Sequence, residues 1–146
     1  MKIALASDHR GYNLKQELIK TLKNNYEILD LGTNSTESVD FPKYGILLGE
    51  TIRDKKADLG IAICGTGIGI SIAANKVKNI MCAKIDSIND AKLAKEHNNA
   101  NVLALRGDLN KEEAIKMIET FLSSKHLQDE KYQRRIKEIK DYDNAR

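Results

Sequence analysis

IAICGTGIGISIAANK, residues Ile61–Lys76, is the stretch of this 146-residue chain that decides the fold. A short apolar run ends at Cys64, then glycines alternate at Gly65, Gly67 and Gly69, and an alanine-rich segment follows. This pattern is typical of a buried strand, a glycine loop and the start of a helix. Backbone N–H groups at the start of a helix favour a bound anion. The Cys64 thiol is predicted at the edge of that anion site, where a helix N-terminus favours the thiolate.

Apolar runs alternate with amphipathic segments along the rest of the chain. Strands are predicted at Lys2–Ala6, Glu27–Leu31, Asp58–Ile63, Asn79–Ile85 and Val102–Leu105. Helices are predicted at Tyr12–Asn24, from Pro42 to about Lys55, from about Gly69 to Val77, and at Ile88–His97, Lys111–Ser123 and Asp129–Tyr142. Such alternation indicates an α/β fold in which helices cover both faces of a five-stranded parallel sheet. The length fits a single domain, residues 1–146.

Composition and charge argue against several classes of protein. Aromatic residues make up only 5% of the chain and the net charge is +3, so neither a stacking surface nor a dense basic patch for nucleic acid is expected. No run of residues is apolar enough for a membrane span, and the apolar run in the first residues is too short for a signal peptide. Two cysteines make no disulfide framework. These features predict a cytoplasmic protein with neither nucleic acid nor membrane as partner.

The last predicted helix, Asp129–Tyr142, is very polar, with a thin apolar stripe. A short helix of this kind depends on tertiary packing for its stability. It is either a solvated surface helix or an arm that packs on a second subunit, and its composition leaves both open.

Three polar clusters stand at the ends of predicted elements. Ser7–Gly11 follows the first strand, Cys64–Gly67 follows the third, and His97–Asn101 ends the fourth helix and leads into the fifth strand. Ligands bind beyond the carboxyl ends of the strands in a parallel sheet. We therefore expect the three clusters to converge on one edge of the sheet and to form the functional site there.

The same residues also have purely structural interpretations. Asp8 could cap the first helix, His9 could be an exposed loop residue, and Cys64 could be a small buried side chain. His97 could cap the C-terminus of the fourth helix, where a positive charge is favourable. The asparagines that follow it, Asn98, Asn99 and Asn101, favour turns.

The glycine loop can be compared with known phosphate and nucleotide motifs. A Walker loop is excluded because Gly-Lys-Ser/Thr is absent, and a phosphatase loop because Ile70 stands where it needs arginine. Gly65 and Gly67 fit the first two glycines of a dinucleotide-binding fingerprint, and Asp86 lies about twenty residues further on, where that motif has its ribose-binding acid. However, Ile70 stands at the position of the third glycine. No spacing of His, Cys and Asp indicates a metal site. A cysteine–histidine hydrolase pairing Cys64 with His97 stays open, as does a nucleotide- or phospho-ligand-binding module without chemistry.

Four segments, in chain order, resemble the ribose-5-phosphate isomerase type B family, which includes galactose-6-phosphate and allose-6-phosphate isomerases. They are SDHRGYNLK, LGT with VDFPKYG, CGTGIGISIAANK and HNNANVLAL, and the similarity covers nearly the whole chain. The resemblance implies a Rossmann-like three-layer α/β/α sandwich with an extra C-terminal helix. It also implies a homodimer or tetramer with active sites shared between two subunits, in which the last helix, at about 129–142, packs on the partner.

An aldose–ketose isomerase moves a proton between adjacent carbons through an enediolate. It needs a base, donors for the developing oxyanion, and a way to open the sugar ring, but no metal or organic cofactor. Cys64 as thiolate is the expected base, and Thr66 shuttles a proton or orients that base. Backbone N–H groups are expected to form the oxyanion cradle; they belong to Gly65, Gly67, Ile68, Gly69, Ile70 and Ser71.

The resemblance also assigns sugar and phosphate contacts. His97 resembles the acid/base that opens the ring, while Asp8 and Asn98 resemble residues that contact the sugar. For the phosphate, it points to His9 and to two cations of the last helix, Lys131 and Arg135. Lys131 stands where the family often has arginine. Lysine keeps the positive charge there but cannot bind a phosphate in a bidentate way.

One departure from the family concerns the phosphate. After NVLAL, many relatives have two small residues and then arginine, whereas this chain has Arg106, Gly107 and then Asp108. Either the role of that arginine is unfilled or Arg106 takes it over from a neighbouring position. The departure leaves the substrate open between five- and six-carbon sugar phosphates.

Overall fold

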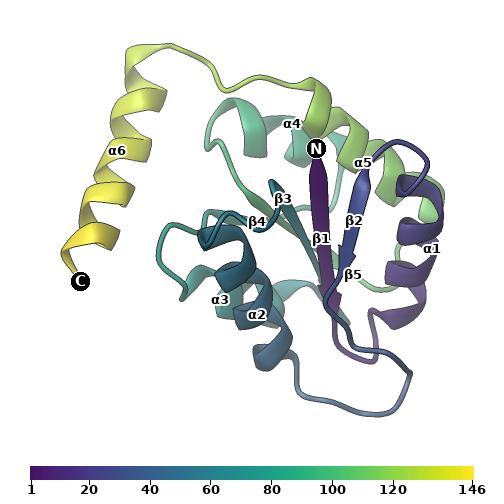
Figure 1. Ribbon diagram of the computed structural model, residues 1–146. Coiled ribbons are helices and arrows are strands. Elements are labelled where there is room, and N and C mark those ends of the chain that lie inside the picture. The colour runs from purple at the N-terminus through teal and green to yellow at the C-terminus, as the bar shows by residue number, and fades with distance from the viewer.

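Five parallel strands form one central sheet in the structure, a computed structural model that describes residues 1–146 (Figure 1). Their order across the sheet is β2-β1-β3-β5-β4. The strands are β1 (Lys2–Ser7), β2 (Glu27–Asp30), β3 (Leu59–Cys64), β4 (Cys82–Lys84) and β5 (Val102–Arg106). The helices are α1 (Tyr12–Leu22), α2 (Phe41–Arg53), α3 (Ile68–Asn75), α4 (Ile88–Glu96), α5 (Lys111–Ser123) and α6 (Glu130–Ala145). The α/β fold with a parallel sheet is confirmed.

The two faces of the sheet differ in the size of their side chains. Because successive side chains of a strand point to opposite faces, Ile3 and Leu5 pack against α1, α4 and α5, while Ala4 and Ala6 face α2 and α3. The small side chains on the second face let α2 and α3 approach the sheet closely. Apolar layers on both faces give the three-layer sandwich.

Two glycines of α2 hold α3 in place. A Cβ on Gly45 would lie 2.9 Å from the Cβ of Ala73, and one on Gly49 would lie 2.8 Å from a methyl carbon of Val77. Both distances are shorter than van der Waals contact, so the helices pack backbone against side chain here. This packing fixes the position of α3, whose first turn follows the glycine loop.

Strand β4 is shorter than the predicted Asn79–Ile85, and the backbone of residues 79–81, which precede it, is bound by the side chain of Asn101. The side chain of Asn101 accepts a hydrogen bond from the N–H of Met81 (2.8 Å) and donates one to the carbonyl of Asn79 (2.9 Å). Asn79 has a positive φ of 69°, which breaks the extended backbone.

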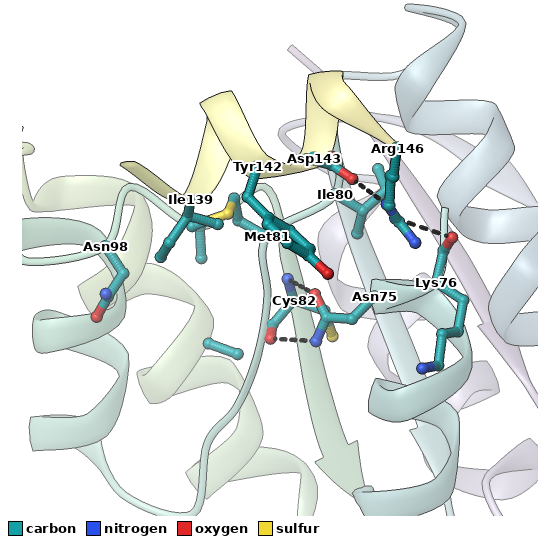
Figure 2. Close-up of a pocket in the computed structure, with 12 residues that line it drawn as sticks. Asn75, Lys76, Ile80, Met81, Cys82, Asn98, Ile139, Tyr142, Asp143 and Arg146 are labelled. Carbon is teal, nitrogen blue, oxygen red and sulfur yellow. Dashed lines mark hydrogen bonds and ion pairs between the residues drawn. The ribbon is translucent and has the colours of Figure 1, made fainter. Parts of the chain in front are cut away.

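Helix α6 stands apart from the sandwich (Figure 1). Ile136 is its one buried residue, and near its C-terminal end Asp143 accepts a hydrogen bond from the N–H of Asn79 (2.6 Å). Between α6 and the body lies a groove of about 530 Å³, into whose mouth Ile139 and Tyr142 project (Figure 2). Cys82 lies at the base of this groove, and burial raises the pKa of its thiol to about 12. None of the helices combines the length and the apolar character that crossing a membrane requires.

Candidate active site

The strand order reverses between β1 and β3, since β2 lies on one side of this pair and the remaining strands lie on the other. Such a switch point is where ligands bind in open α/β sheets, beyond the carboxyl ends of the strands. Ser7 is in register with Ile63, and the N–H of Asp8 donates to the carbonyl of Ile63 (3.2 Å). The structure thus brings Asp8 and Cys64 together at one edge, as predicted.

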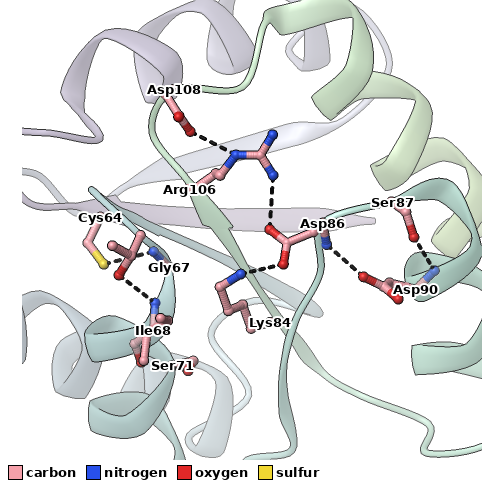
Figure 3. Close-up of polar contacts among 11 residues, drawn as sticks. Cys64, Gly67, Ile68, Ser71, Lys84, Asp86, Ser87, Asp90, Arg106 and Asp108 are labelled. Carbon is pink, nitrogen blue, oxygen red and sulfur yellow. Dashed lines mark hydrogen bonds and ion pairs between the residues drawn. The ribbon is translucent and has the colours of Figure 1, made fainter.

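Cys64 is the last residue of β3, and its side chain faces α3. The residue is 4% exposed, and its Sγ accepts a hydrogen bond from the N–H of Gly67 at 3.2 Å (Figure 3). Gly67 has a φ of +77°, a left-handed conformation in which glycine is favoured. This turn aims the start of α3 at the sulfur, so a thiolate there would keep both the hydrogen bond and the positive end of the helix.

The predicted oxyanion cradle is only partly free. The N–H of Gly67 is bound to Sγ, and that of Ile68 donates to Oγ1 of Thr66 at 3.1 Å. In contrast to the prediction, the N–H of Ser71 is occupied, because it donates to the carbonyl of Gly67 (3.3 Å) within the first turn of α3. Free donors remain in the N–H groups of Gly65, Gly69 and Ile70.

Asp8 is 5% exposed, and only one of its two carboxylate oxygens is hydrogen-bonded within the protein. Oδ1 accepts hydrogen bonds from the N–H groups of Arg10 (2.9 Å) and Gly11 (3.1 Å), and so shapes the turn that leads into α1. Oδ2 accepts no hydrogen bond. Turn formation and contact with a sugar hydroxyl are therefore compatible in this one side chain.

His9 is fixed by the loop that follows β2. Its Nδ1 accepts a hydrogen bond from the N–H of Val39 at 3.2 Å. An accepting Nδ1 places the ring proton on Nε2. The free side of the ring is then a neutral hydrogen-bond donor, which suits a phosphate oxygen.

Arg106 is held in a network of charges at the carboxyl ends of β4 and β5 (Figure 3). Its guanidinium contacts Asp86 at 3.0 Å and Asp108 at 2.8 Å, and Lys84 also pairs with Asp86. The hydrogen bond from Lys84, with that from Arg106, holds the pKa of Asp86 below its usual range. Arg106 is therefore neutralised by two carboxylates, and Asp86 is not free for a ribose.

His97 lies at the opposite edge of the sheet, so the prediction that all three clusters converge is wrong within one chain. Helix α4 runs antiparallel to the strands, and its last turn therefore reaches their amino ends. Asn101, four residues later, accepts a hydrogen bond from the N–H of Gly60 at 3.0 Å, near the start of β3. Gly60 lies four residues before Cys64 along β3, which is about 13 Å.

A second cluster surrounds His97. The ring of Tyr132 stacks on it, with the centroids 4.4 Å apart and the planes 10° from parallel. Lys131 places its ammonium 5.1 Å from the Tyr132 ring centroid, and Arg135 lies one helical turn further along the same side of α6. Asn98, next to His97, is exposed and borders the groove under α6 (Figure 2). Tyr132 is absent from the sequence-based prediction, although an aromatic residue between the two cations was a usable signal.

Each chain thus carries two groups of candidate site residues at opposite edges. We call Asp8, His9 and residues 64–70 the carboxyl-edge half-site. His97, Asn98, Lys131, Tyr132 and Arg135 form the amino-edge half-site. No three His, Cys, Asp or Glu side chains are placed to hold a metal ion together.

Comparison with known proteins gives one consistent result. The sequence model of the ribose/galactose isomerase family matches residues 3–139. A probable ribose-5-phosphate isomerase B of Mycoplasma genitalium is 39% identical, over 97% of this chain and 95% of its own length. The structure of the Clostridium thermocellum ribose-5-phosphate isomerase B aligns with a TM-score of 0.93 at 41% identity, covering 99% of each chain. The Mycoplasma genitalium enzyme with bound ribulose-5-phosphate aligns with a TM-score of 0.91 at 38% identity, over 99% of this chain and 97% of that one.

Proposed function

The chain belongs to the ribose/galactose isomerase family, and from this premise we propose that it interconverts ribose 5-phosphate and ribulose 5-phosphate. The observation that supports this most directly is the thiol of Cys64 among the free N–H groups of the glycine loop. A passive phosphate-binding module needs no such thiol. A metabolic enzyme of this kind fits the cytoplasm that the composition indicates.

The chemistry follows from this arrangement. The Cys64 thiolate removes the proton from C2 of the open-chain aldose and returns it to C1, while a hydroxyl proton moves from O2 to O1. Negative charge on the enediolate oxygens is stabilised by the N–H groups of Gly65, Gly69 and Ile70. Each well-placed donor of this kind contributes roughly 3–4 kcal/mol. The Thr66 hydroxyl, which accepts a hydrogen bond from the N–H of Ile68 in the same loop, relays a proton or orients the base.

The separation of the half-sites supports a shared active site. His97 cannot reach Cys64 of its own chain, because it stacks on Tyr132 at the amino edge of the sheet while Cys64 ends β3 at the carboxyl edge. We therefore propose a homodimer in which the carboxyl-edge half-site of one subunit meets the amino-edge half-site of the other. Exposed apolar residues support an interface on α3 and α6, because Ile68, Ile72 and Tyr142 are 53%, 56% and 77% exposed. Sedimentation of the purified protein distinguishes a dimer from a tetramer of two such dimers.

A steady-state assay on ribose 5-phosphate, allose 6-phosphate and galactose 6-phosphate, run side by side, tests the proposed activity. We expect ribose 5-phosphate to give the highest kcat/KM. Preference for a six-carbon substrate would assign the chain to another activity of its family. If no sugar phosphate turns over and NAD raises the melting temperature, the chain is a nucleotide-binding module instead.

His97→Asn is expected to slow isomerisation of ribose 5-phosphate by about 100-fold or more, the usual contribution of a general acid/base. Exchange of the C1 proton of ribulose 5-phosphate with deuterated solvent should fall much less. That ketose has no ring to open, and proton removal belongs to Cys64. Proton NMR measures both reactions in one sample. Equal loss of both would assign His97 to the proton-transfer step or to positioning.

A further inference from the structure

A cavity of about 290 Å³ beside the glycine loop has no apolar residue in its wall. Its wall residues come from the ends of three strands and the start of α1; they are His9, Arg10, Asn13, Gly65, Gly107 and Asp108. The first turn of α1 contains no acidic residue, and one oxygen of Asp8 accepts the N–H groups of Arg10 and Gly11 just before it. A cavity of this composition suits a charged, strongly hydrogen-bonding group such as a phosphate.

Arg10 occupies the space that a side chain at position 65 would need. A Cβ on Gly65 would lie 2.1 Å from Cζ of the Arg10 guanidinium. Gly65 does not have a positive φ, so the backbone conformation does not itself require glycine there. The missing side chain at Gly65 is therefore what gives the Arg10 guanidinium its place, against the residue that follows Cys64.

Arg10 is also the cation of this edge whose charge is not compensated. Its guanidinium makes neither an ion pair nor a hydrogen bond, whereas Arg106 and Lys84 are both bound to Asp86. His9 contributes a neutral donor, because its Nδ1 accepts from Val39. Asp108 brings a negative charge to the cavity wall, although Arg106 binds one of its oxygens.

We propose that Arg10 binds the phosphate of the substrate from the same subunit as Cys64. The proposal rests on the proposed function, since it names a binding residue for that reaction. Its chemistry is the bidentate pairing of a planar guanidinium with two phosphate oxygens. The neutral Nε2–H of His9 adds a further donor to the same group.

Three variants test the proposal in the full-length protein. Arg10→Gln should raise the KM for ribose 5-phosphate by about 10- to 100-fold, the effect of losing a charged hydrogen bond, with little change in kcat. Its inhibition constant for inorganic phosphate should rise in parallel. Arg10→Lys keeps the positive charge but loses the bidentate geometry of the guanidinium, so both constants should lie between those of wild type and those of Arg10→Gln. Asp108→Asn should shift both constants in the opposite direction, because it removes a negative charge from the cavity.

Arg53→Gln is the matched control. Arg53 is an exposed arginine at the C-terminal end of α2, near the opposite edge of the sheet, and it pairs with Asp54. The same change of charge there should leave KM and phosphate inhibition unaltered. Thermal melts of all four variants check that the fold is retained.

Unchanged phosphate inhibition in Arg10→Gln would overturn the proposal, and so would a fall in kcat without a rise in either constant. Both outcomes mean that Arg10 only fills the space above Gly65. If the wild-type protein turns over no sugar phosphate, the proposed function fails. Calorimetric titration of inorganic phosphate into wild type and Arg10→Gln then still decides whether Arg10 binds phosphate.

Discussion

Cys64→Ala is expected to abolish isomerisation, with kcat lowered by about 10³- to 10⁴-fold, while the protein still folds and binds ribose 5-phosphate. Alanine removes the thiol that is proposed to take the proton from C2. It leaves intact the free N–H groups of Gly65, Gly69 and Ile70. Exchange of the C2 proton with deuterated solvent, followed by NMR, measures the loss at the step concerned, and calorimetry measures binding.

Cys82→Ala provides the matched control. This second cysteine lies under α6, and burial raises the pKa of its thiol to about 12, so it is uncharged at neutral pH. Its loss should cost only about 1 kcal/mol of stability and no activity. Substantial C2 exchange in Cys64→Ala would exclude Cys64 as the base.

Mixing two inactive variants is expected to restore activity. Arg135→Ala alone should weaken phosphate binding by roughly 1.5–3 kcal/mol, since a charged hydrogen bond is lost. If the half-sites of two chains combine, a dimer of one Cys64→Ala and one Arg135→Ala chain has one site with both defects and one with neither. Random exchange in equal amounts then gives about one quarter of the wild-type sites. The assay is run at a low concentration of ribose 5-phosphate, where the Arg135→Ala defect is largest.

Subunit exchange must be shown independently, for example by native mass spectrometry of differently tagged chains. Mixing Cys64→Ala with wild type controls for simple dilution of sites. Exchange without recovered activity would mean that α6 serves its own subunit, and the shared-site proposal would be abandoned.

The sheet and its carboxyl edge could be predicted because they depend on local signals. Apolar runs locate β1 and β3, and the glycines after Cys64 specify the turn into α3. Since residues that follow parallel strands share one edge, Asp8 and Cys64 follow from the pattern as neighbours. The position of His97 at the amino edge was not predicted. His97 follows a helix, and a helix that connects two parallel strands runs back to their amino ends.

Other features depend on contacts between distant segments. Lys15 is fully buried, although its charge predicts a surface position, because its ammonium binds Asp30 on β2 at 2.7 Å. Arg106 looked available for phosphate until its two carboxylate partners were placed. Arg10 belongs to the segment SDHRGYNLK, but its proximity to Gly65 follows only from the packing of β1 beside β3.

The distance between His97 and Cys64 has a consequence for how the protein behaves on dilution. If each complete site needs two chains, a folded single subunit is inactive however stable it is. Specific activity should then be constant at high protein concentration and decline once the concentration falls below the dissociation constant of the dimer. Activity that returns after reconcentration would follow second-order kinetics. Catalysis in this protein would thus report on assembly as directly as it reports on folding.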